Sequence, residues 1–197
     1  MKEQLIIASE NKGKIKETQE ILKQYEIIPI SQLGIEIEIK EDQETFEDNS
    51  IKKAETIAKK LNGKKCIADD SGIEIEYLNG FPGVKTKRWH SGTDRERNLA
   101  ILEKLNGVPK EKRKIKFVTA IALSDGEKTI SATGEIEGYV AENIRGDNGF
   151  GFDEIFELED GRTLAELSDV EKNSISARRI ALEKIKGELD SLEKWVM

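Results

Sequence analysis

Five short segments of this 197-residue chain combine residue types that can bind anions, hold a metal ion or activate water. The first joins an apolar strand, Gln4 to Ser9, to a helix predicted over Asn11 to Gln24. A helix start presents unpaired backbone N–H groups and attracts phosphate. We therefore predict a phosphate cradle that differs from the P-loop pattern, with an ordinary helix cap and a solvated lysine face as the alternative. The residues of this cradle are Ser9, Asn11, Lys12, Gly13 and Lys14.

The second segment is acidic, and it reads Asp69-Asp70-Ser71-Gly72 between two strand-like stretches. Because Asp, Ser and Gly favour turns, we expect a turn that interrupts the strand. Adjacent side chains at a strand end face opposite sides. One carboxylate can therefore be hydrogen-bonded by the fold while the other faces a cleft, where it can bind Mg²⁺ or activate water. The alternative is a tight turn without chemistry.

A third, acidic patch precedes the second predicted helix and contains Glu36, Glu38, Glu41, Asp42 and Glu44. Within it, Glu41 can approach Asp70 across a cleft. Two carboxylates are enough for Mg²⁺, which keeps several waters and binds substrate phosphate oxygens. Otherwise the patch is a solvated acidic loop.

The fourth segment alternates aromatic and small residues, as Gly149-Phe150-Gly151-Phe152-Asp153. Such a loop can lie flat against a planar ring, and stacking of a base on an aromatic side chain contributes roughly 1–3 kcal/mol. The alternative is a core or hinge segment. The fifth segment, Glu171 to Arg179, is a basic helix start in which Ser174 and Arg178 are expected to share a face. Lys172 and Arg178 could reach an anion or a purine edge, although a basic helix start is common.

A mixture of helices, an antiparallel hairpin and short strands must position these segments, which predicts a mixed α/β fold. A helix is expected from Thr45 to Leu61, capped by Thr45, and another over Arg95 to Leu105, capped by Thr93 or Asp94. The last helix begins at Asp169, Asn173 or Ser174 and carries Ile175, Leu182, Ile185 and Leu189. The expected strands are Lys65 to Ala68, Ile73 to Tyr77, and a hairpin of Ile115 to Leu123 with Lys128 to Thr133, extended by Ile136 to Val140.

Composition excludes several function classes. Hydrophobic residues make up 37% and charged residues 36% of the chain, and the net charge of -7 argues against a nucleic-acid scaffold. Cys66 is the only cysteine and His90 the only histidine, so we expect no internal disulfide, no zinc site and no Ser-His-Asp triad. Neither a membrane-spanning run nor a signal-peptide pattern is present, and we expect a cytoplasmic protein without membrane partners.

Taken in order, the five segments resemble the inosine/xanthosine triphosphate pyrophosphatases, a Ham1-like family, from about Leu5 to about Ile185. The family's Ser/Thr-x-Asn-x-x-Lys opening appears as Ser9, Asn11 and Lys14. Its Asp-Asp-Ser-Gly sequence is 69–72, and its Gly-Phe-Gly-Phe/Tyr-Asp loop is 149–153.

The resemblance implies one domain over residues 1–197, with an elongated mixed sheet, flanking helices and two lobes around a central cleft, assembled as a homodimer. It implies Mg²⁺-dependent hydrolysis of dITP, ITP or XTP to the monophosphate and pyrophosphate. In this pattern Glu41 and Asp70 bind Mg²⁺, Asp70 is the base for water, and Lys53, Ser71 and Lys172 contact the substrate.

The sequence departs from the family pattern in three places. The family's Ser-His-Arg is here Ser176-Ala177-Arg178, so a histidine expected to contact the purine is absent. The sequence after Pro82-Gly83 differs over 84–89, and Glu154 replaces a proline. These departures leave two alternatives, a related phosphohydrolase with another base selectivity and a nucleotide-binding regulator without hydrolysis.

Overall fold

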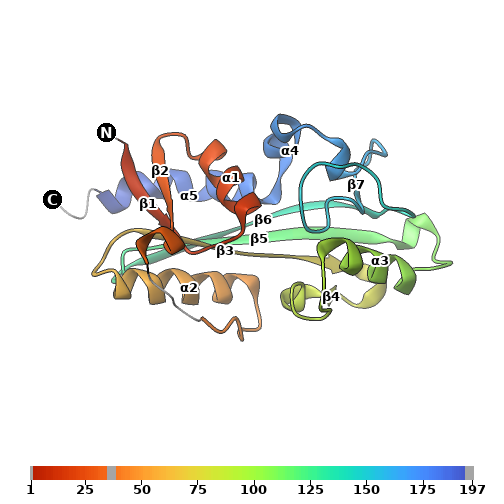
Figure 1. Ribbon diagram of the computed structural model, residues 1–197, viewed down its shortest axis with the longest axis horizontal. Coiled ribbons are helices and arrows are strands. Elements are labelled where there is room, and N and C mark those ends of the chain that lie inside the picture. The colour runs from red at the N-terminus through yellow and green to blue at the C-terminus, as the bar shows by residue number, and fades with distance from the viewer. Residues whose placement is uncertain (1, 35–38, 194–197) are drawn as a thin grey trace. The chain divides into compact units, whose positions relative to one another are not determined.

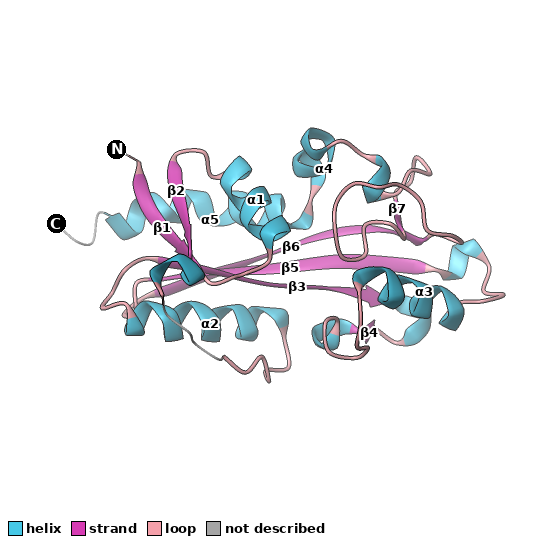
Figure 2. Ribbon diagram, in the orientation of Figure 1, coloured by secondary structure: helices cyan, strands magenta, loops and turns pink. Residues whose placement is uncertain are grey.

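The computed structural model describes residues 2–34 and 39–193, with side chains as far as residue 186, and it has the mixed α/β fold that the sequence predicts (Figures 1 and 2). Its strands are β1 (Glu3–Ile7), β2 (Tyr25–Pro29), β3 (Cys66–Ile75), β4 (Phe81–Pro82), β5 (Lys114–Ser124), β6 (Thr129–Val140) and β7 (Phe156–Glu157). Its α-helices are α1 (Lys12–Ile21), α2 (Phe46–Lys60), α3 (Asp94–Lys104), α4 (Asp169–Ile175) and α5 (Ala177–Glu193).

The strands form one hydrogen-bonded sheet in the order β2-β1-β3-β5-β6-β7, with β4 paired to β3. The chain divides into two compact units. Unit 1 consists of Met1–Asp70, Thr119–Gly134 and Ala177–Met197, and unit 2 consists of Ser71–Val118 and Glu135–Ser176. Strands β3, β5 and β6 therefore each contribute residues to both units.

Unit 1 begins with three parallel strands. β1 pairs with β2 on one side, with Leu5 opposite Ile27, and with β3 on the other, with Ile6 opposite Cys66. Parallel neighbours require crossover connections, and α1 and α2 supply them. Thr45 caps α2 through a hydrogen bond from the Asp48 N–H, as predicted from the Thr45 and Asp48 spacing.

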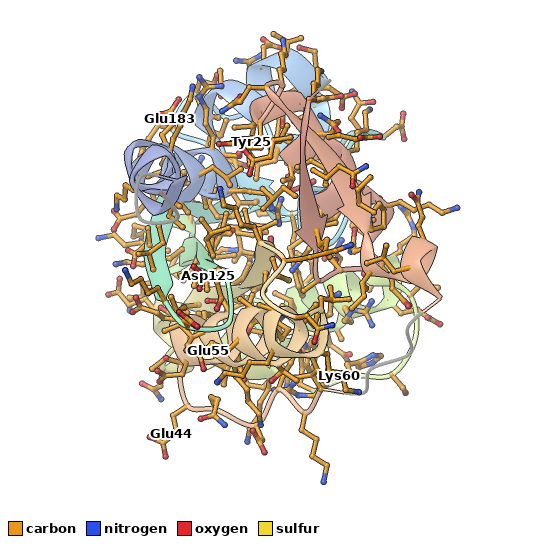
Figure 3. The ribbon with its side chains drawn as sticks, turned by 90° about the vertical axis from the view of Figure 1, so that its left-hand side faces the viewer. Tyr25, Glu44, Glu55, Lys60, Asp125 and Glu183 are labelled. Carbon is orange, nitrogen blue, oxygen red and sulfur yellow. The ribbon has the colours of Figure 1, made fainter. Side chains whose placement is uncertain are left out.

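In unit 1 the side chains on the two faces of β3 pack against different helices. Ile67 packs in a cluster with Leu22, which follows α1, and with Leu182 of α5. The alternate residue Cys66 packs against Ile57 of α2. Since strand side chains alternate, α2 covers one face and α1 with α5 the other (Figure 1). Figure 3 shows this arrangement end-on, with Glu183 of α5 and Glu55 of α2 on opposite sides.

Unit 2 has its own apolar core. Ile73 and Ile75 of β3 are fully buried with Ile101 of α3 and with Phe152 and Phe156 from the chain around β7. Strand β7 pairs antiparallel with the end of β6, and β4 pairs antiparallel with β3. Thr93 caps α3 in a full capping box with Glu96, which decides between the two predicted caps.

Several predicted elements need correction. The expected turn at 69–72 does not interrupt the strand, because β3 runs unbroken from Cys66 to Ile75 (Figure 2). The residues after Ile75 form a 3₁₀ turn rather than strand. Helix α1 ends at Ile21 instead of Gln24, and β2 was not predicted. The predicted hairpin is confirmed as β5 and β6, which extends to Val140.

The last predicted helix is two helices. Ser168 caps α4, and Ser176 then has extended backbone with φ -61° and ψ 148° before α5 begins at Ala177. Ile175, one of the apolar residues of this predicted helix, is 38% exposed. Among the described residues, none of the helices has the length and apolar character needed to cross a bilayer.

Candidate active site

The carboxyl end of β1 is the natural place for a ligand in unit 1. β1 stays paired with β3 as far as Ile7, and the Ala8 N–H then donates to the Ile67 carbonyl at 2.8 Å. Beyond Ala8 the chain enters α1, whereas β3 continues through Asp69 and Asp70. The two crossover helices, α1 and α2, lie on opposite faces of the sheet formed by β2, β1 and β3. This is a topological switch point, where parallel sheets bind ligands.

The start of α1 combines a helix cap with a buried lysine. Asn11 Oδ1 accepts the Lys14 N–H at 3.1 Å, and Ser9 Oγ accepts the Asn11 N–H at 3.2 Å. The predicted alternative of a cap is therefore correct, but its solvated lysine face is wrong for Lys14, which is 7% exposed. Lys12 and Gly13 complete the first turn.

Asp69 is the centre of a buried charge cluster. Its carboxylate accepts from Lys14 Nζ and, at 2.7 Å, from Arg178 Nε, and Arg178 also donates to Glu17. Burial raises the pKa of Asp69, but the charges of Arg178 and Lys14 outweigh this effect and hold its pKa well below the usual range. Burial lowers the pKa of Lys14, and Asp69 offsets part of that change. The ionised Asp69 therefore orients two cations.

Asp70 faces the other side of β3 and has different partners. Asn49 Nδ2 of α2 donates to Asp70 Oδ2 at 3.0 Å, and Lys53 Nζ lies 3.8 Å from Asp70 Oδ1. Burial, together with the nearby charge of Glu41, raises the pKa of Asp70 despite the opposing charge of Lys53. A raised pKa makes this carboxylate a better proton acceptor than an exposed aspartate.

Glu41 and Asp70 meet at one lysine. Lys53 Nζ donates to Glu41 Oε1 at 2.7 Å and to the Asp69 carbonyl at 2.6 Å, in addition to its contact with Asp70. The predicted approach of Glu41 to Asp70 is thus seen in unit 1. Within residues 2–34 and 39–193 no group of three His, Cys, Asp or Glu side chains suits a metal. Two carboxylates fit a hard divalent cation that also binds waters and phosphate oxygens. Glu36 and Glu38 lie outside the described residues.

The remaining predicted site residues belong to unit 2. Ser71 lies on β3. In the 149–153 loop, the Asp153 carboxylate is 1% exposed and accepts from the Phe150 N–H at 2.8 Å and from Lys172 Nζ at 2.5 Å. Lys172 Nζ also lies 4.4 Å from the centre of the Phe150 ring. Phe152 is a core residue, 5% exposed. The core interpretation of the loop is therefore confirmed for Phe152, whereas stacking of a base on Phe150 stays a prediction.

Two α3 side chains hold the same loop. Asp94 Oδ2 accepts the Gly151 N–H at 2.8 Å, and Asn98 Nδ2 donates to the Gly151 carbonyl at 3.0 Å. Asn98 is fully buried and also donates to Glu154 Oε2 at 3.1 Å.

The predicted shared face of Ser174 and Arg178 is wrong. The extended Ser176 separates α4 from α5, so the two residues lie on different helices. Arg178 belongs to unit 1, where it contacts Asp69 and Glu17, whereas Lys172 belongs to unit 2 and contacts Asp153.

Sequence reasoning missed four residues that hold these side chains, namely Glu17, Asn49, Asp94 and Asn98. Helical spacing carried a signal for two of them. Glu17 lies three residues after Lys14 on α1, and Asn49 lies four residues before Lys53 on α2, so each shares a face with a predicted site residue.

Comparison with known proteins identifies the family. The sequence pattern of the Ham1 family matches residues 5–188, which is nearly the whole chain. The chain belongs to the Ham1 family.

Curated relatives in this family have closely similar sequences. The dITP/XTP pyrophosphatase of Bacillus subtilis (strain 168) is 45% identical over 186 residues, which cover 91% of this chain and 93% of the relative. That of Clostridium perfringens (strain 13 / Type A) is 42% identical over 200 residues, covering 96% and 98%. The Ham1 protein of Staphylococcus aureus, a solved structure, matches with a TM-score of 0.84 and 37% identity over 96% of this chain and 99% of that one.

Proposed function

We propose that this Ham1 family chain hydrolyses noncanonical purine nucleoside triphosphates, dITP, ITP and XTP, to the monophosphate and pyrophosphate. The observation that carries the proposal is the contact of Lys53 with both Glu41 and Asp70, within range of the charge of Lys14 of α1. Support comes from relatives named dITP/XTP pyrophosphatase that are 41–45% identical over more than nine-tenths of the chain.

Asp70 is the proposed base. Its carboxylate orients a water molecule for in-line attack on the α-phosphorus and takes the proton, and pyrophosphate leaves. The raised pKa of Asp70 suits this role. Lys14 and Lys53 neutralise the charge of the triphosphate. An ammonium group has three N–H donors, so a contact with one carboxylate orients the ammonium without using all of its donors.

The cofactor that fits is Mg²⁺, with Glu41 and Asp70 as its protein ligands. When bound, Mg²⁺ supplies charge neutralisation to the phosphate oxygens. The assignment is supported by the ammonium of Lys53, which lies 2.7 Å from Glu41 Oε1 and 3.8 Å from Asp70 Oδ1, because carboxylates that attract one cation can attract another.

We assign the proposed substrate contacts within each unit separately. In unit 1 these are Ser9, Asn11, Lys12, Gly13, Lys14, Lys53 and Arg178, which we assign to the triphosphate and the purine edge. In unit 2 they are Ser71, Phe150, Gly151 and the backbone of Phe152 and Asp153, which we assign to the nucleoside, and Lys172, which we assign to the triphosphate. The exposed part of Phe150 gives the purine a ring to stack on, worth roughly 1–3 kcal/mol.

The test measures pyrophosphate release from dITP, ITP, XTP, dATP and dGTP, with Mg²⁺ and with excess EDTA. We expect metal-dependent release that favours the 6-keto noncanonical purines. Asp70→Asn should lower turnover by roughly a thousandfold or more without unfolding the protein. Glu127→Gln is the matched control, since Glu127 is an exposed acid in the β5–β6 turn. Near-normal pyrophosphate release by Asp70→Asn would refute the role of Asp70.

A second candidate is hydrolysis with a different base preference. Ala177 stands where the resemblance implies a histidine, and in this chain it is 2% exposed at the start of α5. The same panel of triphosphates separates the two candidates. Saturable binding of every nucleotide without any turnover would instead identify a nucleotide-binding regulator.

We also propose, on the resemblance, that residues 1–197 act as one domain and as a homodimer, and, on the sequence pattern, that the protein acts in the cytoplasm. Light scattering after size-exclusion chromatography tests the dimer, which should have about twice the 22.2 kDa mass of the chain.

A further inference from the structure

Both backbone polar groups of Gly151 are held by one helix. The Gly151 N–H donates to Asp94 Oδ2 at 2.8 Å, and its carbonyl accepts from Asn98 Nδ2 at 3.0 Å. Asp94 and Asn98 lie four residues apart on α3, so they project from the same face. The geometry of one helix therefore sets the orientation of the peptide groups on either side of Gly151.

The helix side of this contact is itself well anchored. Thr93 and Glu96 cap α3 reciprocally, and Arg97 pairs with Asp94 at 2.5 Å. Asn98 is fully buried, and its amide donates to Gly151 and, at 3.1 Å, to Glu154 Oε2. Two acceptors on one NH₂ group define which way the Asn98 amide faces.

The loop side is prepared for close approach of a ligand. Gly151 has φ +67°, and a Cβ placed on it would meet nothing within 4 Å. One residue earlier, the Phe150 N–H is held by Asp153, and the Phe150 ring lies against Lys172. The segment at 150–151 is thus held by α3 at Gly151 and by Asp153 at Phe150, with open space beside Gly151.

We propose that Asp94 and Asn98 are positioning residues for recognition of the purine base, acting through the backbone of Gly151. The inference rests on the proposed function, because it needs the base to bind at Phe150 and Gly151. A loop that is already ordered loses less conformational freedom when a ligand binds. An unclamped loop would bind all bases more weakly, and it would reject a 6-amino purine less well, since discrimination depends on precisely placed polar groups.

Two substitutions of Asp94 distinguish the effect of its hydrogen bond to Gly151 from the effect of its charge. Asp94→Ala removes the acceptor of the Gly151 N–H, whereas Asp94→Asn keeps an acceptor oxygen. For Asp94→Ala we expect KM for dITP to rise roughly tenfold with kcat within about threefold, the pattern of lost uniform binding. Asp94→Asn should restore most of the affinity. Glu103→Gln, an exposed change on the same helix, is the control.

The Asn98 variants separate positioning from stability. Asn98→Asp is isosteric, but its carboxylate faces the Gly151 carbonyl and the Glu154 carboxylate, so both stability and affinity should fall. In the double variant that adds Glu154→Gln to Asn98→Asp, the amide introduced at position 154 can donate to the carboxylate introduced at position 98. The Gly151 carbonyl still lacks its donor. The double variant should therefore regain thermal stability while KM stays raised, whereas a merely structural role predicts that KM recovers with stability.

Calorimetric titration with inosine monophosphate gives a readout that does not depend on turnover. We expect its Kd to rise in parallel with KM in Asp94→Ala and in the double variant. An unchanged Kd and KM in folded Asp94→Ala would overturn the inference, and this variant alters a half-exposed side chain, which favours folding. Loss of turnover in the wild-type protein would defeat the proposed function instead, while the titration would still decide the inference.

Discussion

At the scale of single residues, the adjacent aspartates show how one strand gives neighbours opposite roles. Asp69 contacts Lys14 and Arg178 on one side of β3, and Asp70 contacts Asn49 on the other. The sequence predicted this division although it predicted a turn there, because alternation holds within a strand as well as at its end. Glu17 could not be identified from the sequence as the partner of Arg178. Helix α1 has other acidic residues, and the sequence does not show which face of α1 lies against α5.

The buried thiol of Cys66 gives a prediction at this scale. Burial raises its pKa to about 12, whereas an unfolded thiol ionises near pH 8.5. Between these values the unfolded chain loses a proton that the folded chain keeps, so the contribution of Cys66 to the free energy of unfolding falls as pH rises. The expected slope is about 1.4 kcal/mol per pH unit above about pH 9.

Comparison with Cys66→Ala isolates this effect, since lysine and tyrosine ionisations cancel in the difference. We expect the advantage of the wild-type protein over Cys66→Ala, measured by urea unfolding, to shrink steadily from pH 8.5 to pH 10.5. A difference that stays constant over this interval would show that the folded thiol ionises as readily as the unfolded one.

At the scale of elements, local propensity failed wherever tertiary pairing decided the outcome. Asp, Ser and Gly favour turns, yet residues 69–72 remain strand, because the pairing of β3 with its neighbouring strands, β5 among them, outweighs this local preference. The helical periodicity at 169–189 predicts one helix, but the chain is extended at Ser176. Capping signals were more reliable, since Asn11, Thr45 and Thr93 all cap helices as local side-chain hydrogen bonds dictate.

The packing of β6 against the start of α5 is an element-scale contact that tolerates no side chain. A Cβ on Gly134 would lie 2.1 Å from the Ala177 carbonyl oxygen and 2.7 Å from the Ala181 nitrogen, both backbone atoms of α5. Gly134→Ala should therefore destabilise the protein by about 1–3 kcal/mol, the usual cost of overpacking. The neighbouring Glu135→Ala, which removes a surface ion pair with Lys116, should cost no more than about 1 kcal/mol.

Urea unfolding of both variants measures the two costs side by side. Because Ala177 and Arg178 begin the same helix, a shift of α5 in Gly134→Ala should also weaken nucleotide binding, whereas Glu135→Ala should not. Equal stability of the two variants would mean that α5 moves away from β6 without cost.

At the scale of the whole molecule, the single domain with two lobes is implied by the resemblance and stays a prediction, and the sequence did not indicate which residues form each compact unit. Unit 1 combines three segments, from the beginning, middle and end of the chain. That partition depends on long-range strand pairing, which periodicity within a short window does not report. It also explains why site residues that are distant in sequence, such as Lys14 and Arg178, meet within one unit.

Continuity of β3, β5 and β6 predicts that the two units unfold together, although each has its own apolar core. If one unit unfolded alone, the three shared strands would lose their pairing partway along, leaving unpaired backbone groups at the break. In a Trp195→Phe background, fluorescence reports on Trp89 of unit 2, which contacts Phe81 and His90, and the reactivity of Cys66 reports on unit 1. We expect both probes to give one urea midpoint, as in a two-state transition. Midpoints that differ by more than roughly 0.5 M urea would instead show that each core is stable by itself and that the strands can break between them.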